Sequence, residues 1–420
     1  MKFKIAIQTP KGTHDLVKEN AEMFLNFIFE ASKHSYAYGF EYIRTPVIEY
    51  EEVFTSSLGL VSDVVEKEMF YIKREKGNYV LRPEGTAPIV RAYFQNGMHT
   101  WKQPVELFYI APMFRYEKPQ LGRYREHYQW GLEILNSNDP IYDAKVILTF
   151  DRFLKKFKLT DYVFRINSLG CSNDREKYKK DLKKYYKKHL KNLCNDCKKR
   201  YKVNPLRLLD CKVDQEYKKD APNILNYLCN ECEKHFNSVL EYIETLEINY
   251  ELDHTLVRGF DYYSKTVFEL YFKEVPVAII SGGRYDNLGK ALGGAVLPSV
   301  GGSLGVERFM EIIKMHNVSL KSIKTQPKIF VAYVTDKAKA YALSVYDLLL
   351  RNNFPVAENF GKPTLSSQLE IANKMGVSYC VIIGHKELGT KSVILKNMKD
   401  GIQETIPLNQ LFEELKSRKL

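Results

Sequence analysis

Hydrophobic and polar positions in the first third of the chain predict one helix followed by strands. Apolar residues recur every three or four positions over residues 23–31, which predicts an amphipathic helix that ends near Gly39. A strand is expected over residues 40–47. Two longer extended stretches, residues 105–114 and 125–135, bracket a turn-rich loop, and this arrangement is typical of a long antiparallel pair.

The rest of the chain changes character twice. Residues 168–250 have a helical pattern, are rich in lysine and contain six of the seven cysteines, so we interpret them as an insertion. The insertion separates two parts of one larger domain, residues 1–167 and 251–318. The polar residues 319–327 predict a linker, and strand and helix patterns then alternate through residues 328–420, as in a small α/β domain.

Composition limits the class of protein. The 420 residues are 45% hydrophobic and 27% charged, which is typical of a globular chain. No apolar run reaches the roughly 18–20 residues of a membrane-spanning helix, and residues 1–12 lack the continuous hydrophobic stretch of a secretory signal. We therefore expect a cytoplasmic protein with no membrane partner and with reduced thiols.

The charge of the chain is positive and unevenly distributed. Sixty-three Lys and Arg residues against 51 Asp and Glu residues give a net charge of +12, which favours a polyanionic partner. Residues 175–200 alone hold twelve basic and three acidic residues, and their apolar positions fall at helical spacing. This pattern fits a solvated helix face and a nucleic-acid contact equally well.

Polar residues on a predicted strand are the first sign of a site. Within residues 127–135, two-residue alternation puts Gln129, Gly131 and Glu133 on one face and apolar residues on the other. On alternation alone, a half-buried strand with a solvated polar face is the better interpretation. Three arginine-bearing segments change that assessment, because arginine's planar fork suits phosphate oxygens and neighbouring glycines permit close approach. Their arginines are Arg115 with Arg123, Arg258, and Arg308.

With these segments the chain resembles the histidyl-tRNA synthetases, a family of class II aminoacyl-tRNA synthetases. Three stretches are similar to the class II motifs, of which the degenerate first one builds the dimer interface in the family: residues 39–46, 114–117 with Arg123, and 301–308. Three more resemble stretches specific to the histidine enzymes: residues 81–87, 256–263 and 282–286.

The resemblance implies an α+β fold and a two-step reaction. An antiparallel sheet flanked by helices would form the catalytic domain, residues 1–167 and 251–318. The helical insertion and a C-terminal α/β anticodon-binding domain, residues 328–420, would complete a chain that acts as a homodimer. Histidine would attack ATP, with Mg²⁺ on the phosphates, to give histidyl-adenylate and pyrophosphate. The histidyl group would then pass to the 3′ end of histidine tRNA.

The resemblance assigns roles in ATP binding to residues of these motifs. Arg115 would grip the α-phosphate, and Arg258 would touch both this phosphate and the histidine carboxylate, which makes them the catalytic pair. Arg123 and Arg308 would hold the β/γ end of ATP, and Glu117 would lie near the adenine. Fixed positive charge is the main requirement of this step, because both reactants are anionic.

A second group of residues would bind histidine. The amino and carboxylate groups would be bound by Glu84, Gly85 and Thr86, which we expect in an extended segment, together with Gln129, Arg115 and Arg258. Glu133 and Tyr263 would each meet one imidazole nitrogen, because discrimination of histidine requires a partner at both. Tyr262 and Tyr285 would line the pocket.

The loop between the paired strands would contact the acceptor end of the tRNA through Lys118 and Gln120. Gln120 matches the bacterial pattern of the family, whereas Lys118 replaces its arginine. Lysine keeps the charge but lacks the bidentate fork. The resemblance therefore supports recognition of the extra 5′ guanylate of histidine tRNA less firmly than it supports catalysis.

The cysteines leave two interpretations open. Residues 194–197 and 229–232 form two CxxC pairs separated by 31 residues, and four thiolates of this kind can hold a structural zinc. The interval is longer than in most zinc ribbons, and the insertion also contains Cys171 and Cys211, so free thiols are an equally good interpretation. Cys380 lies in an apolar stretch and is expected in a core.

Two other functions compete with a histidine–tRNA ligase. An inert regulatory subunit of histidine biosynthesis resembles these synthetases but typically lacks the C-terminal domain and the arginine and histidine-pocket residues, which are present here. A non-enzymatic RNA-binding protein would explain the lysine-rich residues 175–200 but not the phosphate-directed arginines. The ATP-dependent ligase is therefore the preferred prediction.

Overall fold

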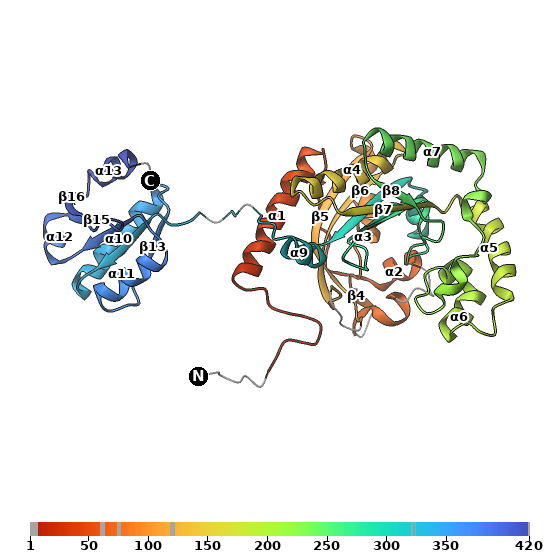
Figure 1. Cartoon of the computed structure of the whole chain (residues 1–420), viewed down its shortest axis with the longest axis horizontal. Coiled ribbons are helices and arrows are strands. Elements are labelled where there is room, and N and C mark those ends of the chain that lie inside the picture. The colour runs from red at the N-terminus through yellow and green to blue at the C-terminus, as the bar shows by residue number, and fades with distance from the viewer. Residues whose placement is uncertain are drawn as a thin grey trace. The chain divides into compact units, whose positions relative to one another are not determined.

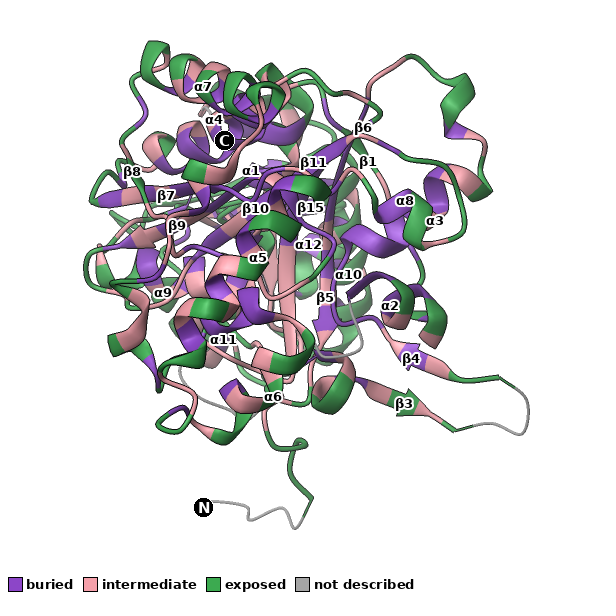
Figure 2. Ribbon diagram, turned by 90° about the vertical axis from the view of Figure 1, so that its right-hand side faces the viewer, coloured by how far each residue is buried: buried purple, intermediate pink, exposed green. Residues whose placement is uncertain are grey.

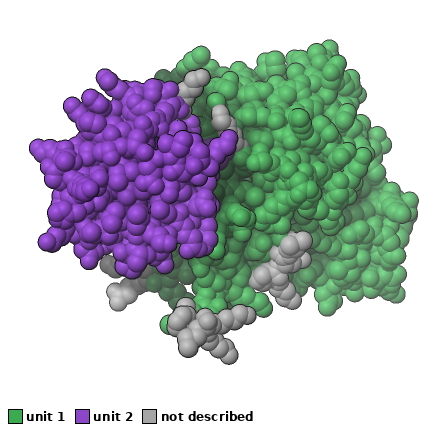
Figure 3. All heavy atoms as spheres, turned by 60° about the vertical axis from the view of Figure 1, so that its left-hand side comes forward, with its two compact units in different colours: residues 1–321 green, residues 322–420 purple. Residues whose placement is uncertain are grey.

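The computed structural model describes residues 7–58, 64–73, 77–117, 122–320, 322–323 and 325–418. The chain divides into two compact units, residues 1–321 and 322–420, which Figure 3 shows in separate colours. None of the helices in the described ranges is long and apolar enough to cross a membrane.

An eight-stranded sheet forms the centre of the first unit (Figure 1). The strand order is β1-β5-β6-β11-β10-β9-β7-β8. The β1–β5 and β7–β8 pairs at the two edges are parallel, and the pairs between them are antiparallel. The strands are β1 (Glu41–Tyr42), β5 (Val105–Phe114), β6 (Glu126–Leu135), β7 (Tyr162–Ser168), β8 (Tyr250–Leu252), β9 (Ser264–Phe272), β10 (Ile280–Arg284) and β11 (Ser299–Gly305).

Two-residue alternation gives this sheet one apolar face that a layer of helices covers. Trp130, Leu132 and Ile134 of β6 are buried in this layer, as the alternation predicts. Figure 2 shows the same division: the strands are largely buried, and the helices are buried on one side and exposed on the other. The helices are α1 (Glu19–Ala37), α4 (Ile141–Lys156), α7 (Asn230–Thr245) and α9 (Val306–Met315).

The other face of the sheet carries a second apolar cluster and the polar site. Beside it lies a three-stranded antiparallel sheet of β2 (Ile48–Tyr50), β4 (Tyr79–Leu81) and β3 (Phe70–Ile72). Three helices pack against one another there: α2 (Glu51–Leu58), α3 (Thr86–Gln95) and α8 (Leu288–Ala291).

The insertion lies between β7 and β8 and contains α5 (Ser172–Lys187), α6 (Asn195–Val203) and α7. Tyr178, Leu182 and Tyr186 of α5 are buried at the predicted helical spacing. The basic residues 175–200 do not form one helix, because the chain turns between α5 and α6. α7 packs on α4, so the last part of the insertion shares the core of the central sheet.

The second unit is an α/β domain, as the alternating pattern predicts. Its five-stranded sheet has the order β13-β12-β14-β15-β16, with β12 parallel to both its neighbours and the last three strands antiparallel. Apolar clusters cover both faces of the sheet, and Cys380 is buried in one of them, as expected. Its elements are β12 (Ile329–Tyr333), α10 (Asp336–Arg351), β13 (Val356–Glu358), α11 (Leu365–Lys374), β14 (Tyr379–Ile383), α12 (His385–Thr390), β15 (Ser392–Asn397), β16 (Gln403–Pro407) and α13 (Leu411–Ser417).

Two local predictions are wrong. The strand expected over residues 40–47 is limited to Glu41–Tyr42, because the Thr45 carbonyl accepts a hydrogen bond from the Arg82 guanidinium (3.0 Å) and not from a strand. The segment of residues 81–87 is not extended throughout, because α3 begins at Thr86. The long antiparallel pair of β5 and β6 is confirmed.

Candidate active site

The central strands bring predicted site residues to one face of the sheet. The register pairs Gly131 of β6 with Tyr109 of β5 on one side and with Ser303 of β11 on the other. Side chains two residues apart share a face, so Gln129, Gly131 and Glu133 point to the same side, as the alternation predicts. This side lies opposite the helical layer.

Two glycines in these strands leave room for larger side chains. A Cβ atom at Gly131 would overlap the ring of Tyr109, and a Cβ atom at Gly301 would overlap the Glu133 carboxylate. Glycine is therefore required at both positions by close approach of a neighbour.

A cavity of about 860 Å³, including its open mouth, lies over this face. Most of the predicted site residues line it: Glu84, Thr86, Arg115, Glu117, Arg123, Gln129, Arg258, Tyr262, Tyr263 and Arg308.

Four arginines converge on the cavity although they come from separate parts of the chain. The Nε of Arg308 donates a hydrogen bond to the carbonyl of Gly122 (3.0 Å), and the Nε of Arg115 donates one to the carbonyl of Pro83 (2.8 Å). Burial, followed by the positive charges of Arg123 and Arg115, lowers the pKa of Arg308. Like charges held this close favour a polyanionic ligand in the cavity.

Two carboxylates offset part of this positive charge. Glu117 accepts a hydrogen bond from Arg123 (3.1 Å) and lies 3.8 Å from Arg115. Glu269 forms an ion pair with Arg258. Burial alone would lower the pKa of Arg258, but Glu269 and the neighbouring tyrosines raise it, so this guanidinium stays charged. The Nε atoms of Arg123 and Arg258 are buried without a hydrogen-bond partner among the described residues.

The start of α3 positions an acidic group at the other end of the cavity. The two oxygens of Glu84 accept hydrogen bonds from the amides of Thr86 (2.8 Å) and Ala87 (2.9 Å), so this carboxylate caps the helix. Burial raises the pKa of Glu84, and the hydroxyl of Tyr262 lies 3.4 Å from it. Gly85 lies between Glu84 and the helix, and a Cβ there would overlap the Tyr109 ring.

Glu133 and Tyr285 lie behind the cavity wall and are not part of its lining. Glu133 is 1% exposed and accepts hydrogen bonds from the Thr86 hydroxyl (2.8 Å) and from the Tyr285 hydroxyl. Burial raises the pKa of Glu133 to about 8, although the two hydroxyls act in the opposite direction. This buried acid is therefore connected to the cavity through Thr86.

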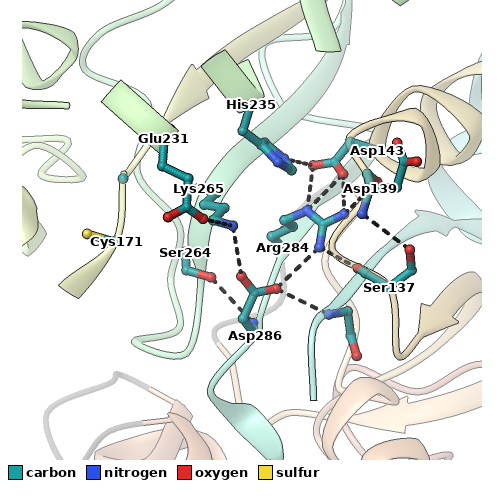
Figure 4. A network of polar contacts seen from close by, with 12 residues as sticks. Ser137, Asp139, Asp143, Cys171, Glu231, His235, Ser264, Lys265, Arg284 and Asp286 are labelled. Carbon is teal, nitrogen blue, oxygen red and sulfur yellow. Dashed lines mark hydrogen bonds and ion pairs between the residues drawn. The ribbon is translucent and has the colours of Figure 1, made fainter. Parts of the chain in front are cut away.

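A buried ion network holds β10, the strand that ends directly before Tyr285 (Figure 4). The fully buried Arg284 pairs with Asp143 of α4 (2.7 Å) and Asp286 (3.3 Å), and Asp143 also lies 3.4 Å from His235 of α7. The motif of residues 282–286 thus ties β10 to two helices.

Several residues that line the cavity were not predicted from the sequence. His127 shares the face of Gln129, so the alternation was enough to find it. Burial, followed by the charges of Arg115 and Arg308, lowers the pKa of His127 to about 3, and its imidazole is neutral at pH 7. Other missed lining residues are Tyr109, Tyr124, Phe260, Ser281, Ser303 and Glu307.

Glu307 is the missed residue with the clearest role in positioning. It follows β11 in the first turn of α9, and its carboxylate accepts hydrogen bonds from the amide of Tyr128 (2.8 and 3.0 Å). Burial raises the pKa of Glu307 to about 7. Its place beside Arg308 in the third motif was the available signal.

The residues predicted to contact the tRNA acceptor end are not described by the structure, and the predicted cysteine site is assembled differently from the prediction. Lys118 and Gln120 lie outside the described residues. The CxxC pairs of residues 194–197 and 229–232 belong to two separate groups, so one site made of their four thiolates does not form in the described part of the insertion. The reason is that each pair lies beside a different CxxD segment.

Comparisons with known proteins place nearly the whole chain in one family. Residues 12–309 match the family model described as histidyl-tRNA synthetase, and residues 328–418 match the model described as anticodon binding domain. The histidine–tRNA ligase of Thermosipho melanesiensis is 44% identical over 397 residues, which cover 94% of both chains. That of Halothermothrix orenii is 40% identical over 416 residues, covering 97% of this chain and 99% of the relative.

Solved structures are similar as well. The apo histidyl-tRNA synthetase of S. aureus has a TM-score of 0.81 and 29% identity, covering 97% of this chain and 99% of that one. A Bacillus halodurans structure named as an ATP phosphoribosyltransferase regulatory subunit/histidyl-tRNA synthetase is similar in fold alone, with a TM-score of 0.64, 21% identity, and coverage of 91% and 99%. On the family model and the near full-length relatives, the chain belongs to the histidyl-tRNA synthetase family.

Proposed function

We propose that this chain is a histidine–tRNA ligase that activates histidine with ATP and transfers it to the 3′ end of histidine tRNA. The observation that carries the proposal is the single cavity in which four arginines from three motifs face a buried acidic and phenolic pocket. The near full-length relatives named histidine–tRNA ligase support the same reaction.

The arginines suit the first step. A carboxylate oxygen of histidine attacks the α-phosphorus of ATP, a P–O bond forms, and the bond to the departing pyrophosphate breaks. Both reactants are anionic, so fixed guanidinium groups lower the barrier by stabilising the charge of the transition state. We assign Arg115 and Arg258 to the α-phosphate and the histidine carboxylate, and Arg123 and Arg308 to the β/γ end of ATP.

Buried hydrogen-bonding groups suit the choice of histidine. We assign Glu84, Thr86 and Gln129 to the amino and carboxylate groups of the substrate, and Tyr263 and Glu133 to the two imidazole nitrogens. An amino acid other than histidine would leave the polar groups of this pocket without hydrogen-bond partners. The pocket therefore rejects other amino acids strongly. Thr86 lines the cavity and its hydroxyl donates a hydrogen bond to Glu133, so direct contact between Glu133 and the substrate requires the Thr86 side chain to turn away.

ATP and Mg²⁺ are the substrate and ion that the family implies. Glu117 lines the cavity, and Glu269 and Arg308 line the hollow next to it. Mg²⁺ typically binds one or two carboxylates together with substrate phosphates, so Glu117 and Glu269 fit the ion. When bound, Mg²⁺ would neutralise part of the negative charge of the ATP phosphates.

The remaining parts of the proposal concern partners and location. We assign the anticodon to the C-terminal unit, residues 322–420, whose family model carries that description. Lys118 and Gln120 are assigned to the acceptor end, and residues 39–46 to a homodimer interface. We also propose a cytoplasmic location, because charged tRNA is used there in translation.

The alternative to an active ligase is a catalytically inert regulatory subunit of histidine biosynthesis. It is not favoured, because the phosphate-directed arginines occur together with most of the predicted histidine-binding residues in one cavity, and because the chain has the C-terminal unit. An RNA-binding protein without activity leaves the buried acids unexplained.

ATP–pyrophosphate exchange with each of the twenty amino acids tests the proposal. We expect exchange with histidine alone, and its loss in Arg258→Gln. Arg351→Gln serves as a matched control, because Arg351 is exposed on α10 of the other unit. Absence of exchange with every amino acid would favour the inert relative, and exchange with another amino acid would refute the pocket assignment.

A further inference from the structure

Six cysteines and two aspartates of the insertion gather into two separate groups. Within each group the side-chain donor atoms all lie within 4.8 Å of one another. We name them site A, formed by Cys194, Cys197, Cys211 and Asp214, and site B, formed by Cys171, Asp174, Cys229 and Cys232. We propose that each site binds one Zn²⁺ through three thiolates and one carboxylate, independently of the ligase reaction.

Both sites have the same construction, although they share no residue. Each combines one CxxC segment with one CxxD segment: residues 194–197 with 211–214 in site A, and 229–232 with 171–174 in site B. This pairing explains the interval between the two CxxC pairs. The 31 residues lie between two sites and not within one, whereas only 13 residues separate the two halves of site A.

The distances in site A are those of a metal site and not of a disulfide. The Sγ atoms of Cys194 and Cys211 lie 3.9 Å apart, and the Sγ of Cys211 lies 3.7 Å from a carboxylate oxygen of Asp214. Two sulfurs bound tetrahedrally at about 2.3 Å lie about 3.8 Å apart, and a sulfur and an oxygen about 3.6 Å apart. A disulfide would need about 2.05 Å between the sulfurs.

Backbone amides are aimed at the sulfurs of site A. The amides of Val213 and Asp214 both lie 3.3 Å from the Sγ of Cys211, and the amide of Cys197 lies 3.4 Å from the Sγ of Cys194. Amide N–H groups aimed at sulfur hold these side chains in place and are typical of the backbone concavities that surround metal–sulfur sites.

The carboxylates are oriented in the same way in both sites. Asp174 accepts hydrogen bonds from the amides of Cys171 and Cys229, both at 3.1 Å, so it joins the two halves of site B. Asp214 accepts a hydrogen bond from the amide of Cys194 (3.1 Å). Hydrogen bonds of this kind fix ligating carboxylates in metal sites.

The donor set selects the metal. Three soft sulfur donors with one oxygen in a four-coordinate group suit Zn²⁺, whereas Mg²⁺ and Ca²⁺ require six or more oxygen donors. The sites contain no open position for a substrate, so a structural ion is implied.

Each site supports a residue that holds the loop of the histidine pocket. Arg175 directly follows Asp174 of site B and donates a hydrogen bond to the carbonyl of Tyr263. Arg207, in the chain between the halves of site A, donates one to the carbonyl of Arg258 (3.1 Å). Binding of zinc would therefore fix the loop of residues 258–263 from outside the cavity.

Metal content of the full chain, purified without chelator, tests the proposal. By inductively coupled plasma mass spectrometry we expect two zinc ions per wild-type chain. We expect one zinc ion in Cys194→Ser, one in Cys229→Ser and none in the double variant. Cys380→Ala is the matched control and should retain two, because Cys380 is buried in the other unit. Well under one zinc per wild-type chain after incubation with Zn²⁺ would overturn the proposal.

A second measurement does not depend on how well the cysteine variants fold. Co²⁺ titration of the metal-free wild-type chain should give sulfur-to-cobalt charge-transfer absorption that saturates at two ions per chain. Saturation at one, or disulfides in the mass of the intact protein, would overturn the two-site assignment. Asp214→Asn retains an oxygen that can accept the hydrogen bond of the Cys194 amide but loses the charge. Asp174→Asn also loses the charge and keeps an acceptor for only one of the two amides that Asp174 binds. We expect each to weaken zinc binding about 10-fold or more in competition with a chelator, and unchanged affinity would exclude carboxylate ligation.

Discussion

Single residues that line the cavity or lie directly behind its wall are held in protonation states that differ from their ordinary ones. Burial raises the pKa of Glu133 to about 8 and lowers the pKa of His127 to about 3, while Arg258 stays charged beside Glu269. Each of these departures has a local cause in burial and neighbouring charge. Perturbed groups that converge on one cavity are typical of a functional site.

We predict that Glu133→Ala abolishes histidine activation while largely sparing ATP binding. The substitution removes the acceptor that faces Thr86 and Tyr285 and leaves one imidazole nitrogen without a partner. A buried hydrogen-bonding group left without its partner costs up to about 3 kcal/mol, which corresponds to a fall of about 100-fold in kcat/KM for histidine. Histidine-dependent pyrophosphate exchange measures it, with Glu413→Ala on the other unit as control. Unchanged exchange would refute the assignment of Glu133.

The raised pKa of Glu133 also predicts a dependence of stability on pH. An unfolded glutamate releases its proton near pH 4.5, whereas the folded protein keeps it until about pH 8. Between these values the folded state binds more protons, so the free energy of unfolding falls as pH rises, by at most about 1.4 kcal/mol per pH unit. In Glu133→Gln this contribution disappears.

Thermal unfolding of the ligand-free protein at intervals from pH 5 to 8 measures this difference. The stability of wild type relative to Glu133→Gln should decrease steadily with pH. A constant difference would show that Glu133 is ionised throughout the range.

At the scale of elements, one buried guanidinium connects three parts of the first unit. Arg284 of β10 lies between Asp143 of α4 and Asp286, and Asp143 also meets His235 of α7. Burial alone would raise the pKa of Asp143, but Arg284 and His235 hold it below its ordinary value. The strand next to Tyr285 therefore depends on helices from the catalytic part and from the insertion.

We predict that Asp143→Ala destabilises the protein by about 3–5 kcal/mol, because it leaves a fully buried arginine without its main counterion. Chemical denaturation measures the change. The matched control is Asp161→Ala, which removes an exposed partner of Lys273 at 3.8 Å and should cost less than about 1 kcal/mol. Equal effects of the two substitutions would contradict the importance of the network.

At the scale of the whole molecule, the two units have separate hydrophobic cores. The clusters around the central sheet contain residues of the first unit, and those around the second sheet contain residues of the C-terminal unit. The cavity is lined by residues of the first unit alone. Activation and anticodon binding should therefore be separable.

We predict that residues 1–321 alone retain histidine-dependent pyrophosphate exchange within about tenfold of the full chain. Charging of histidine tRNA should fall about 100-fold or more, because the anticodon contacts are lost. Both activities are measured on the truncated and full chains. Equal charging by the two would show that the C-terminal unit does not read the tRNA.

The strands of the site were easier to predict than its walls. Alternation in β6 was sufficient to place Gln129 and Glu133 on one face, because a strand repeats every two residues. It did not show that Glu133 lies behind Thr86, since that depends on where α3 packs. The extended segment expected before α3 failed for a related reason: the Glu84 carboxylate caps a helix that begins two residues later.

The sequence by itself determined the strand and helix periodicities, the position of the linker before the C-terminal unit, and the set of arginines that belong to the motifs. It could do so because these features depend on residue type and local spacing. Only the tertiary structure decided which cysteines meet. Each CxxC pair lies against a CxxD segment, and the packing of the insertion helices determines which one. Local spacing cannot predict such contacts, because packing creates them between segments that are distant in the sequence.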